Sequence, residues 1–392
     1  MPSRNFSLRL SLFNAVLFLG SGIQLPFLPL WLKDRGLPDS QVALIVALMM
    51  AVRILAIPLG TFIADITQRR RSVIIACAFG STAAYVLLGF MPGFWPILLT
   101  GMLAAALLAP IVPLTETLAV EGSAHYGLDY GRIRLWASLS FLSGSLGAGA
   151  LLEVVPVSWV IMLIAGAQAL GALVTLLLPP DTAVRATSRV EPIRLASLIT
   201  LVSATSFIVF MLAAGLGQAS HGFLYAFGSV YFEDLGYSKF VIGLLWASSV
   251  MAEVLMFAFS NRFYRSFGSV RLIVLGTALA TLRWVVTALA PPLGILFLVQ
   301  TLHAGSFGLT HLGTMHYIRE RVPANMRNSA QGLYSVLSSG VLLSGTMWAS
   351  GALYAGLGGA AFLVMAVISA LACGLAMLLL ALNPTAPSAP GA

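Results

Sequence analysis

The chain has 392 residues, of which 59% are hydrophobic and only 9% are charged, and its mean hydropathy is +0.96. A water-soluble domain needs far more charge on its surface, so this composition excludes a soluble protein and indicates that lipid surrounds most of the chain. The formal net charge of +8 does not indicate a nucleic-acid partner, because the basic residues are spread over many short loops.

Apolar runs of about 20 residues recur along the chain, and a helix of that length crosses roughly 30 Å of hydrocarbon. In the first half we predict six spans, at residues 8–32, 41–64, 73–91, 94–120, 134–155 and 157–178. In the second half we predict six more, at residues 204–232, 240–261, 270–290, 293–316, 330–355 and 359–382. The predicted fold class is therefore an all-α integral membrane protein with twelve transmembrane helices.

A polar stretch from Pro179 to Arg194, PPDTAVRATSRVEPIR, separates two apolar halves of similar length. It predicts an N-terminal six-helix bundle, a central cytoplasmic loop, a C-terminal six-helix bundle and a short cytoplasmic tail. The corresponding residues are 1–178, 179–195, 196–383 and 384–392.

The basic residues indicate the orientation of the spans, because cytoplasmic loops of membrane proteins are enriched in arginine and lysine. With the N-terminus inside, 16 of the 21 basic residues lie in inner segments, and the outer loops hold only Lys33, Arg35 and Lys239. The other two, Arg53 and Arg283, lie within spans. We therefore expect both termini to be cytoplasmic and the protein to be integral to the bacterial inner membrane.

Several motifs of enzymes and metal sites are missing. The sequence has no G-x-x-x-x-G-K-S/T loop for ATP phosphates and neither H-E-x-x-H nor G-x-S-x-G. Its two cysteines, Cys77 and Cys373, lie inside apolar runs. We expect no enzyme activity, cofactor, metal site or disulfide. The first apolar run, from Leu8 to Trp31, is too long for a signal peptide and should remain as the first span.

The two halves repeat at an offset of 200 residues. The offset places Trp31, Asp34, Gly36, Val42, Leu44 and Arg53 over Tyr231, Asp234, Gly236, Ile242, Leu244 and Glu253. Two six-helix halves in parallel repeat are typical of secondary transporters, whose site lies between the halves near mid-membrane.

Arg53 and Glu253 occupy equivalent positions of the repeat, about twelve residues into their helices and hence near mid-membrane. An ionised side chain there costs at least roughly 2.5–3.5 kcal/mol, which makes each a functional candidate. Two interpretations are open. The two side chains form an ion pair that closes one conformation, or Arg53 receives an anionic substrate while Glu253 carries a proton.

Four segments, drawn from both halves, carry a resemblance to a known family. They are LPFLPLWLKDRG (Leu25–Gly36), LDYGRIRLWAS (Leu128–Ser138), AEVLMFAFSNRF (Ala252–Phe263) and QTLHAGSFGLTHLGTMHYI (Gln300–Ile318). They resemble the major facilitator superfamily, in the group that contains lactose permease and, more closely, the 3-phenylpropionate permease type. The resemblance covers almost the whole chain. It implies the major facilitator fold of two six-helix bundles and transport by alternating access.

The resemblance also implies roles for charged residues. Glu116 and Arg134 match the spacing of the pair that binds galactoside in lactose permease, so they either line the cavity or lock the inner face. Arg283 and His303 fall where that permease has an arginine of its ninth span and a histidine of its tenth span, and we expect Arg283 to bind substrate. Ser306 replaces its proton-carrying glutamate, so proton coupling would fall to Glu253 or Glu116, with His303.

The loop between the second and third spans matches the gating motif of the superfamily in part. Asp65, Arg70 and Arg71 fit the motif, whereas Ile66 and Gln68 replace its usual basic residue and glycine. We expect Asp65, Arg70 and Arg71 to take part in gating.

Uncharged residues of the spans add candidates for the binding site. Gln24 either hydrogen-bonds substrate or joins helices. Trp246 and Tyr225 either wall a cavity that accepts an aromatic ring or pack against neighbouring helices.

The ionisable residues that we expect to be embedded are three cations and two anions, namely Arg53, Arg134 at the start of its span, Arg283, Glu116 and Glu253. They carry one surplus positive charge, which favours a carboxylate ligand. We predict that the protein is a monomer that carries a small aromatic carboxylate such as 3-phenylpropionate together with a proton. Its partners would be this organic anion, protons and the lipid bilayer, and the proton gradient would drive transport. The alternatives are proton-coupled uptake of a neutral sugar or nucleoside, and a non-transporting membrane sensor on the same fold.

Overall fold

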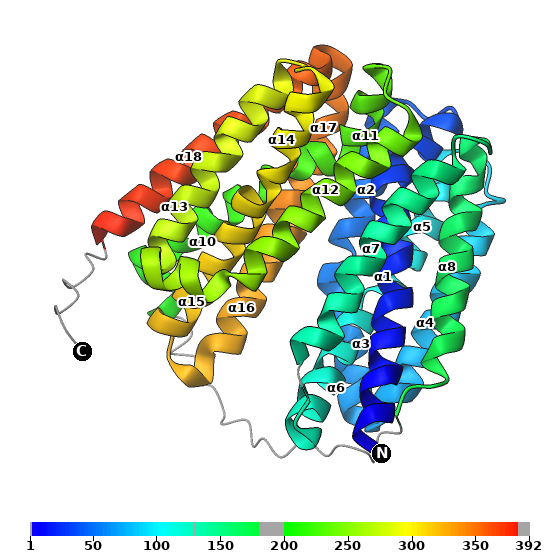
Figure 1. Ribbon diagram of the computed structural model, residues 1–392, viewed down its shortest axis with the longest axis horizontal. Coiled ribbons are helices and arrows are strands. Elements are labelled where there is room, and N and C mark those ends of the chain that lie inside the picture. The colour runs from blue at the N-terminus through cyan, green and yellow to red at the C-terminus, as the bar shows by residue number, and fades with distance from the viewer. Residues whose placement is uncertain (1, 129, 180–199, 383–392) are drawn as a thin grey trace. The chain divides into compact units, whose positions relative to one another are not determined.

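The structure is a computed structural model that describes residues 2–128, 130–179 and 200–382. Figure 1 shows that these residues form helices joined by short turns, and none of them forms a strand. The predicted central loop, apart from Pro179, and the predicted tail lie outside the described residues.

The first half of the chain forms six spans, two of which consist of two consecutive helices. Its helices are α1 (Pro2–Asp34), α2 (Asp39–Ala51), α3 (Arg53–Thr67), α4 (Arg70–Leu88), α5 (Phe94–Leu108), α6 (Ile111–Tyr126), α7 (Tyr130–Leu151), η1 (Val157–Trp159) and α8 (Val160–Thr175).

The second half is more interrupted, and two of its spans contain a π-helix, η3 or η5. Its helices are α10 (Thr205–Ala219), α11 (Gly222–Asp234), α12 (Lys239–Ala258), α13 (Ser260–Ala288), α14 (Leu293–Thr301), η3 (Ala304–Leu309), α15 (Thr310–Arg321), η4 (Ala324–Met326), α16 (Arg327–Ser335), η5 (Val336–Leu343), α17 (Ser344–Leu357), η6 (Gly358–Ala361) and α18 (Phe362–Leu382).

Ten stretches of the described residues are long and apolar enough to cross a membrane. One of them, Ala324–Leu382, has 59 residues and holds the last two predicted spans, which are joined by η6. The remaining predicted span is α7, whose first five residues include Arg132 and Arg134 and which is therefore less apolar. Together these segments account for the twelve predicted spans.

The fourth span is interrupted where its prolines lie. α5 ends at Leu108 and α6 begins at Ile111, because Pro110 lacks an N–H group and its ring excludes the carbonyl one turn earlier. A methyl group on Gly60 of α3 would collide with the Pro110 ring, so α3 packs closely against this interruption. The second span is also irregular, at Val52, and Arg53 is the first residue after it.

The described residues divide into two compact units. Unit 1 contains those within 1–188, 224–247 and 347–356, and unit 2 contains those within 189–223, 248–346 and 357–392. In unit 1, α1 packs along α7 and α8, and α4 packs along α5 and α8. In unit 2, α13 packs along α18 and α15, and α10 packs along α18 and η5. The domain boundaries expected from the sequence stay a prediction.

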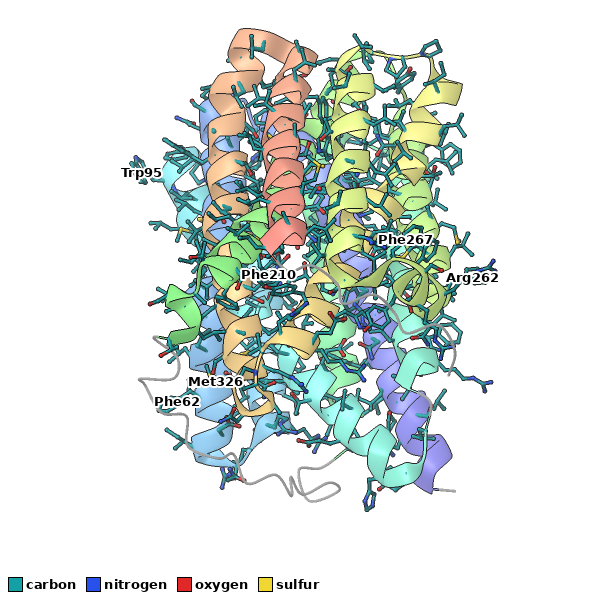
Figure 2. All side chains as sticks on the ribbon, turned by 90° about the vertical axis from the view of Figure 1, so that its left-hand side faces the viewer. Phe62, Trp95, Phe210, Arg262, Phe267 and Met326 are labelled. Carbon is teal, nitrogen blue, oxygen red and sulfur yellow. The ribbon has the colours of Figure 1, made fainter. Side chains whose placement is uncertain are left out.

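Each unit has an apolar interior and an apolar exterior, as a protein surrounded by lipid requires. In unit 2, Phe210 is fully buried and its ring stacks on Tyr317, with centroids 4.1 Å apart. In unit 1, Phe62 and Trp95 are 60% and 67% exposed, and they point away from the helices that carry them (Figure 2). Large apolar side chains in such positions are expected to contact acyl chains.

Glycines allow α1 and α7 to pack at close range. A methyl group on Gly22 would collide with the Phe141 carbonyl, and one on Gly144 would collide with the Leu19 carbonyl. Both obstacles are backbone atoms, which cannot move without separating the helices. Small residues at helix contacts allow this kind of packing inside membranes.

We expect Gly22→Ala to destabilise the protein by about 1–3 kcal/mol, the usual cost of overpacking. Thermal unfolding in detergent, followed by size-exclusion chromatography, would measure the loss. Gly147→Ala is the control on α7, because nothing lies within 4 Å of the methyl group it would add. Equal melting temperatures for the two variants would contradict the close packing of α1 on α7.

A second glycine contact joins α7 to the start of α12 within unit 1. The Ser145 hydroxyl donates a hydrogen bond to the Gly243 carbonyl at 3.0 Å. A methyl group on Gly243 would collide with the Ser145 carbonyl, and one on Gly149 would lie 2.7 Å from the Lys239 carbonyl. The two backbones therefore touch directly, with few side chains between them.

Candidate functional site

Unit 1 contains a cavity of about 300 Å³, which is at the lower end of the roughly 300–1,000 Å³ typical of small-molecule sites. Helices α1 to α7 supply most of its wall, and α11 and α17 supply one residue each. Its lining is mainly apolar and consists of Leu17, Ser21, Gln24, Leu25, Leu28, Pro29, Val46, Met49, Met50, Arg53, Tyr85, Ala105, Leu108, Ala109, Val112, Phe141, Tyr225 and Met347.

Arg53 is the cation of this cavity. It is the first residue of α3, and its side chain is exposed. Its guanidinium contacts the Met50 sulfur at 3.7 Å, and no described carboxylate of unit 1 lies within ion-pair distance of it. A guanidinium in apolar surroundings is stabilised by an anionic partner. Glu253 belongs to unit 2, so a direct Arg53–Glu253 pair stays a prediction.

Two further polar side chains of the cavity are bonded to each other. The Tyr85 hydroxyl on α4 donates a hydrogen bond to Gln24 Oε1 on α1 at 2.8 Å. Tyr85 is fully buried, whereas Gln24 is partly exposed. The predicted candidate Gln24 therefore lines the cavity and also joins α1 to α4. Tyr85 was not singled out in the sequence.

The aromatic candidates differ in their access to the cavity. Tyr225 lines it, and its ring stacks on Trp246 with centroids 6.1 Å apart. Trp246 itself is 5% exposed, is not part of the lining, and donates a hydrogen bond from its indole N–H to the Ser229 hydroxyl at 2.9 Å. Trp246 thus lies behind Tyr225 and holds that ring in place.

Glu116 and Arg134 form an ion pair in unit 1. Arg134 Nε lies 3.1 Å from Glu116 Oε1, and the Arg134 guanidinium lies 4.6 Å from the centre of the Phe18 ring. Neither residue belongs to the lining of the cavity. The positive charge of Arg134 is therefore already compensated by Glu116, unlike that of Arg53.

Unit 2 holds a second group of candidates around the buried Arg283. Its guanidinium donates hydrogen bonds to Gln300 Oε1 at 2.8 Å and to the Ser306 hydroxyl at 3.1 Å, and it contacts His303 Nδ1 at 3.0 Å. His303 Nε2 in turn lies 3.2 Å from Glu253 Oε2. Arg283, His303 and Glu253 thus form one chain of contacts across three spans.

The contact with Arg283 determines the proton position on His303. A guanidinium can only donate, so Nδ1 of His303 must accept. The proton of the neutral ring is then on Nε2, where it donates to the Glu253 carboxylate. A proton on Nδ1 would point at the N–H groups of the guanidinium, and two donors cannot form a hydrogen bond with each other. In this arrangement Glu253 is the group that can take up a proton.

Ser306 and Gln300 complete this group, although neither was proposed as a site residue. Ser306 also contacts His221 Nε2 at 3.2 Å, and Ser249 donates a hydrogen bond to Gln300 Oε1 at 3.2 Å. Gln300, His303 and Ser306 are spaced three residues apart, which places them on one face of the helix. That spacing was the available sequence signal.

Two of the three predicted gating residues are bonded to residues outside their loop. Arg70 pairs with Glu121 at 2.9 Å, and Arg71 donates a hydrogen bond to the Leu176 carbonyl at 2.7 Å. Asp65 is exposed, and its backbone carbonyl accepts a hydrogen bond from the Gln68 amide. Gln68, at the position of the motif glycine, has a φ of 54°, a conformation that favours glycine. Gating by this loop stays a prediction.

A family pattern and several transporters resemble this chain over most of its length. The pattern of the MFS_1-like family matches residues 7–366. A probable 3-phenylpropionic acid transporter of Escherichia coli (strain K12) is 29% identical over 361 residues, covering 90% of this chain and 92% of that protein. A maltose permease of Geobacillus stearothermophilus is 26% identical, covering 88% and 89% of the two chains. A putative nucleoside transporter of Escherichia coli, YegT, is 24% identical, covering 80% and 77%.

Solved structures show the same fold. A mutant of the nucleoside transporter NupG matches with a TM-score of 0.85 at 16% identity, over 95% of this chain and 99% of that one. A bacterial homologue of the human lysosomal transporter Spinster matches with a TM-score of 0.74 at 14% identity, over 99% of each chain. The predicted fold of twelve helices in two six-helix bundles is thereby confirmed. The chain belongs to the MFS_1-like family and is a membrane transporter with the major facilitator fold, not an enzyme.

Proposed function

We propose that this transporter carries a small aromatic monocarboxylate, such as 3-phenylpropionate, together with a proton. The observation that carries the proposal is Arg53, a cation in an apolar cavity with no described carboxylate of its own unit beside it. A substrate carboxylate would supply that partner through charge-assisted hydrogen bonds, which are about twice as strong as neutral ones.

The rest of the cavity suits an aromatic ring. Three methionine side chains, those of Met49, Met50 and Met347, belong to the lining, as does the Tyr225 ring. Thioether sulfurs make favourable contacts with aromatic rings, worth roughly 0.3–1.5 kcal/mol each, and unbranched methionines adapt to the shape of a ligand. The residues therefore provide a polar end for the carboxylate and an apolar space for the ring.

A neutral sugar or nucleoside is the second candidate, because relatives include a maltose permease and a putative nucleoside transporter. Such ligands bring many hydroxyl donors and need acceptors. The polar side chains of the cavity are Ser21, Gln24, Arg53, Tyr85 and Tyr225, with no Asp or Glu among them. Each of these groups can donate a hydrogen bond, and the lining has no carboxylate to accept from a sugar hydroxyl, which favours a carboxylate ligand.

Proton coupling is proposed for Glu253. Protonation would remove the negative charge that His303 holds near the buried Arg283, and binding of the carboxylate would compensate Arg53. A proton and a monocarboxylate together bring no net charge, so the protein loaded with both has the same net charge as the empty protein. Binding of either ligand alone changes the net charge by one unit, and we propose that this balance couples the two fluxes. We also propose an inner-membrane location with both termini cytoplasmic, and a monomer.

Uptake into proteoliposomes would test the proposed substrate class. We expect radiolabelled 3-phenylpropionate to enter faster with an inward proton gradient, after subtraction of entry into protein-free liposomes. Unlabelled aromatic monocarboxylates in excess should compete, whereas maltose, uridine and 3-phenylpropanol should not. Protein-dependent flux of uridine or maltose, with none of any aromatic acid, would overturn the proposal.

A further inference from the structure

The hydrogen bond between Tyr85 and Gln24 has a direction that matters for ligand choice. Tyr85 is fully buried on α4, and its hydroxyl donates to Gln24 Oε1 at 2.8 Å. Gln24 lies on α1 in the wall of the same cavity as Arg53. Tyr85 therefore supports Gln24 from behind.

The geometry fixes the orientation of the Gln24 amide. A phenol has one O–H donor, and a buried donor without an acceptor costs about 1–3 kcal/mol. Among the described residues, the acceptor of the Tyr85 hydroxyl is Gln24 Oε1. If the amide turned over, its NH₂ group could donate to the Tyr85 oxygen, but the buried Tyr85 O–H group would lose its acceptor. The oxygen of Gln24 is thus committed to Tyr85, and its NH₂ group is the end that remains for a ligand.

Arg53 and Gln24 then offer the same kind of contact to the cavity. Guanidinium N–H groups and the amide NH₂ can only donate, so both call for an acceptor. A carboxylate has about four acceptor positions and no donor. A carboxamide of the same shape brings its own NH₂ group, and an alcohol brings an O–H donor. Either would leave one hydrogen-bonding group at this end of the cavity unmatched.

We infer that Tyr85 is a positioning residue that holds Gln24 as a hydrogen-bond donor and so makes the site prefer carboxylates over carboxamides and alcohols. The inference rests on the proposed function. Without the Tyr85 hydroxyl, the Gln24 amide can turn over and present its oxygen, which suits a ligand that donates. The discrimination would then relax while the charge of Arg53 stays in place.

The test compares the dissociation constants of 3-phenylpropionate and 3-phenylpropionamide on the purified full-length protein. We expect Tyr85→Phe to lower the preference for the acid over the amide by about tenfold, the effect of one fixed hydrogen bond. Tyr126→Phe, the same change away from the cavity, should leave the preference unaltered. In a Gln24→Leu background, Tyr85→Phe should have no further effect on the preference, because no amide is left to orient.

Two results would overturn the inference alone. In the first, the acid binds in an Arg53-dependent way, but Tyr85→Phe keeps the same preference for the acid over the amide as the unmodified protein. The other is an equal change of preference with and without Gln24, which would mean that Tyr85 acts by another route. If the unmodified protein binds no aromatic acid in an Arg53-dependent way, the proposed function fails as well.

Discussion

Replacing Arg53 by glutamine is expected to weaken the binding of 3-phenylpropionate by about 30- to 4,000-fold. The range corresponds to the roughly 2–5 kcal/mol lost when one partner is removed from a hydrogen-bonded charge pair that the bound ligand shields from water. The loss should be large because Arg53 is the one cationic residue in the lining of the cavity, and the other polar groups there are neutral. Isothermal titration calorimetry or a scintillation proximity assay on purified protein would measure it.

Arg53→Gln should not harm folding, so a loss of binding in this variant can be assigned to the missing charge. The guanidinium makes a sulfur contact and no described ion pair within its unit, so the variant removes a charge without breaking a salt bridge there. Arg53→Lys is the matched control. It keeps the charge but not the two-pronged geometry that suits a carboxylate, so its affinity should fall between those of the other two proteins. Undiminished binding by a folded Arg53→Gln variant would refute the proposed anion site.

Glu253→Gln is expected to abolish the proton-driven part of uptake while leaving exchange of substrate intact. Glutamine resembles a permanently protonated glutamate, so the transport cycle can run with substrate but cannot release the proton. If one proton is carried with one monoanion, a pH difference of one unit supplies about 1.4 kcal/mol, which corresponds to about a tenfold ratio of inside to outside substrate concentration. We expect that stimulation to disappear in the variant.

Initial rates of uptake with and without an inward proton gradient, together with counterflow of labelled against unlabelled substrate, would separate the two effects. Proteoliposomes with Arg53→Gln provide the background, because passive entry of the neutral acid is the same in them. Glu116→Gln is the competing variant, since Glu116 is the other candidate for proton coupling and forms its ion pair with Arg134. Loss of gradient stimulation in Glu116→Gln, with stimulation kept in Glu253→Gln, would assign the proton to Glu116.

The twelve spans can be predicted from the sequence, because each needs only a long apolar run. The interruption of the fourth span also has a local cause in the sequence, because Pro110 lacks the N–H group that a continuous helix needs. Glu116 and Arg134 lie on consecutive spans and do form an ion pair, but neither lines the cavity, and a role as a lock of the inner face stays a prediction.

The wall of the cavity could not be predicted in the same way. The helices are apolar on every side, because one face meets lipid and the other meets protein, so hydrophobic periodicity does not reveal which face surrounds the cavity. Met49 and Tyr85 are ordinary residues of such helices, and only packing places them beside Arg53. The partner of Arg70, Glu121, lies 51 residues away along the chain, beyond the reach of a local motif.

The direct backbone contact between α7 and α12 has a mechanical consequence. When two helices interdigitate through large side chains, many side-chain contacts must break before the helices separate, and each cavity left behind costs free energy. At Gly149 and Gly243 the two backbones meet with few side chains between them, and hydrogen bonds cross the contact, including one from the Ser145 hydroxyl to the Gly243 carbonyl and one from the Phe240 N–H to the Glu153 carboxylate. Few groups would therefore have to separate if these two helices moved apart.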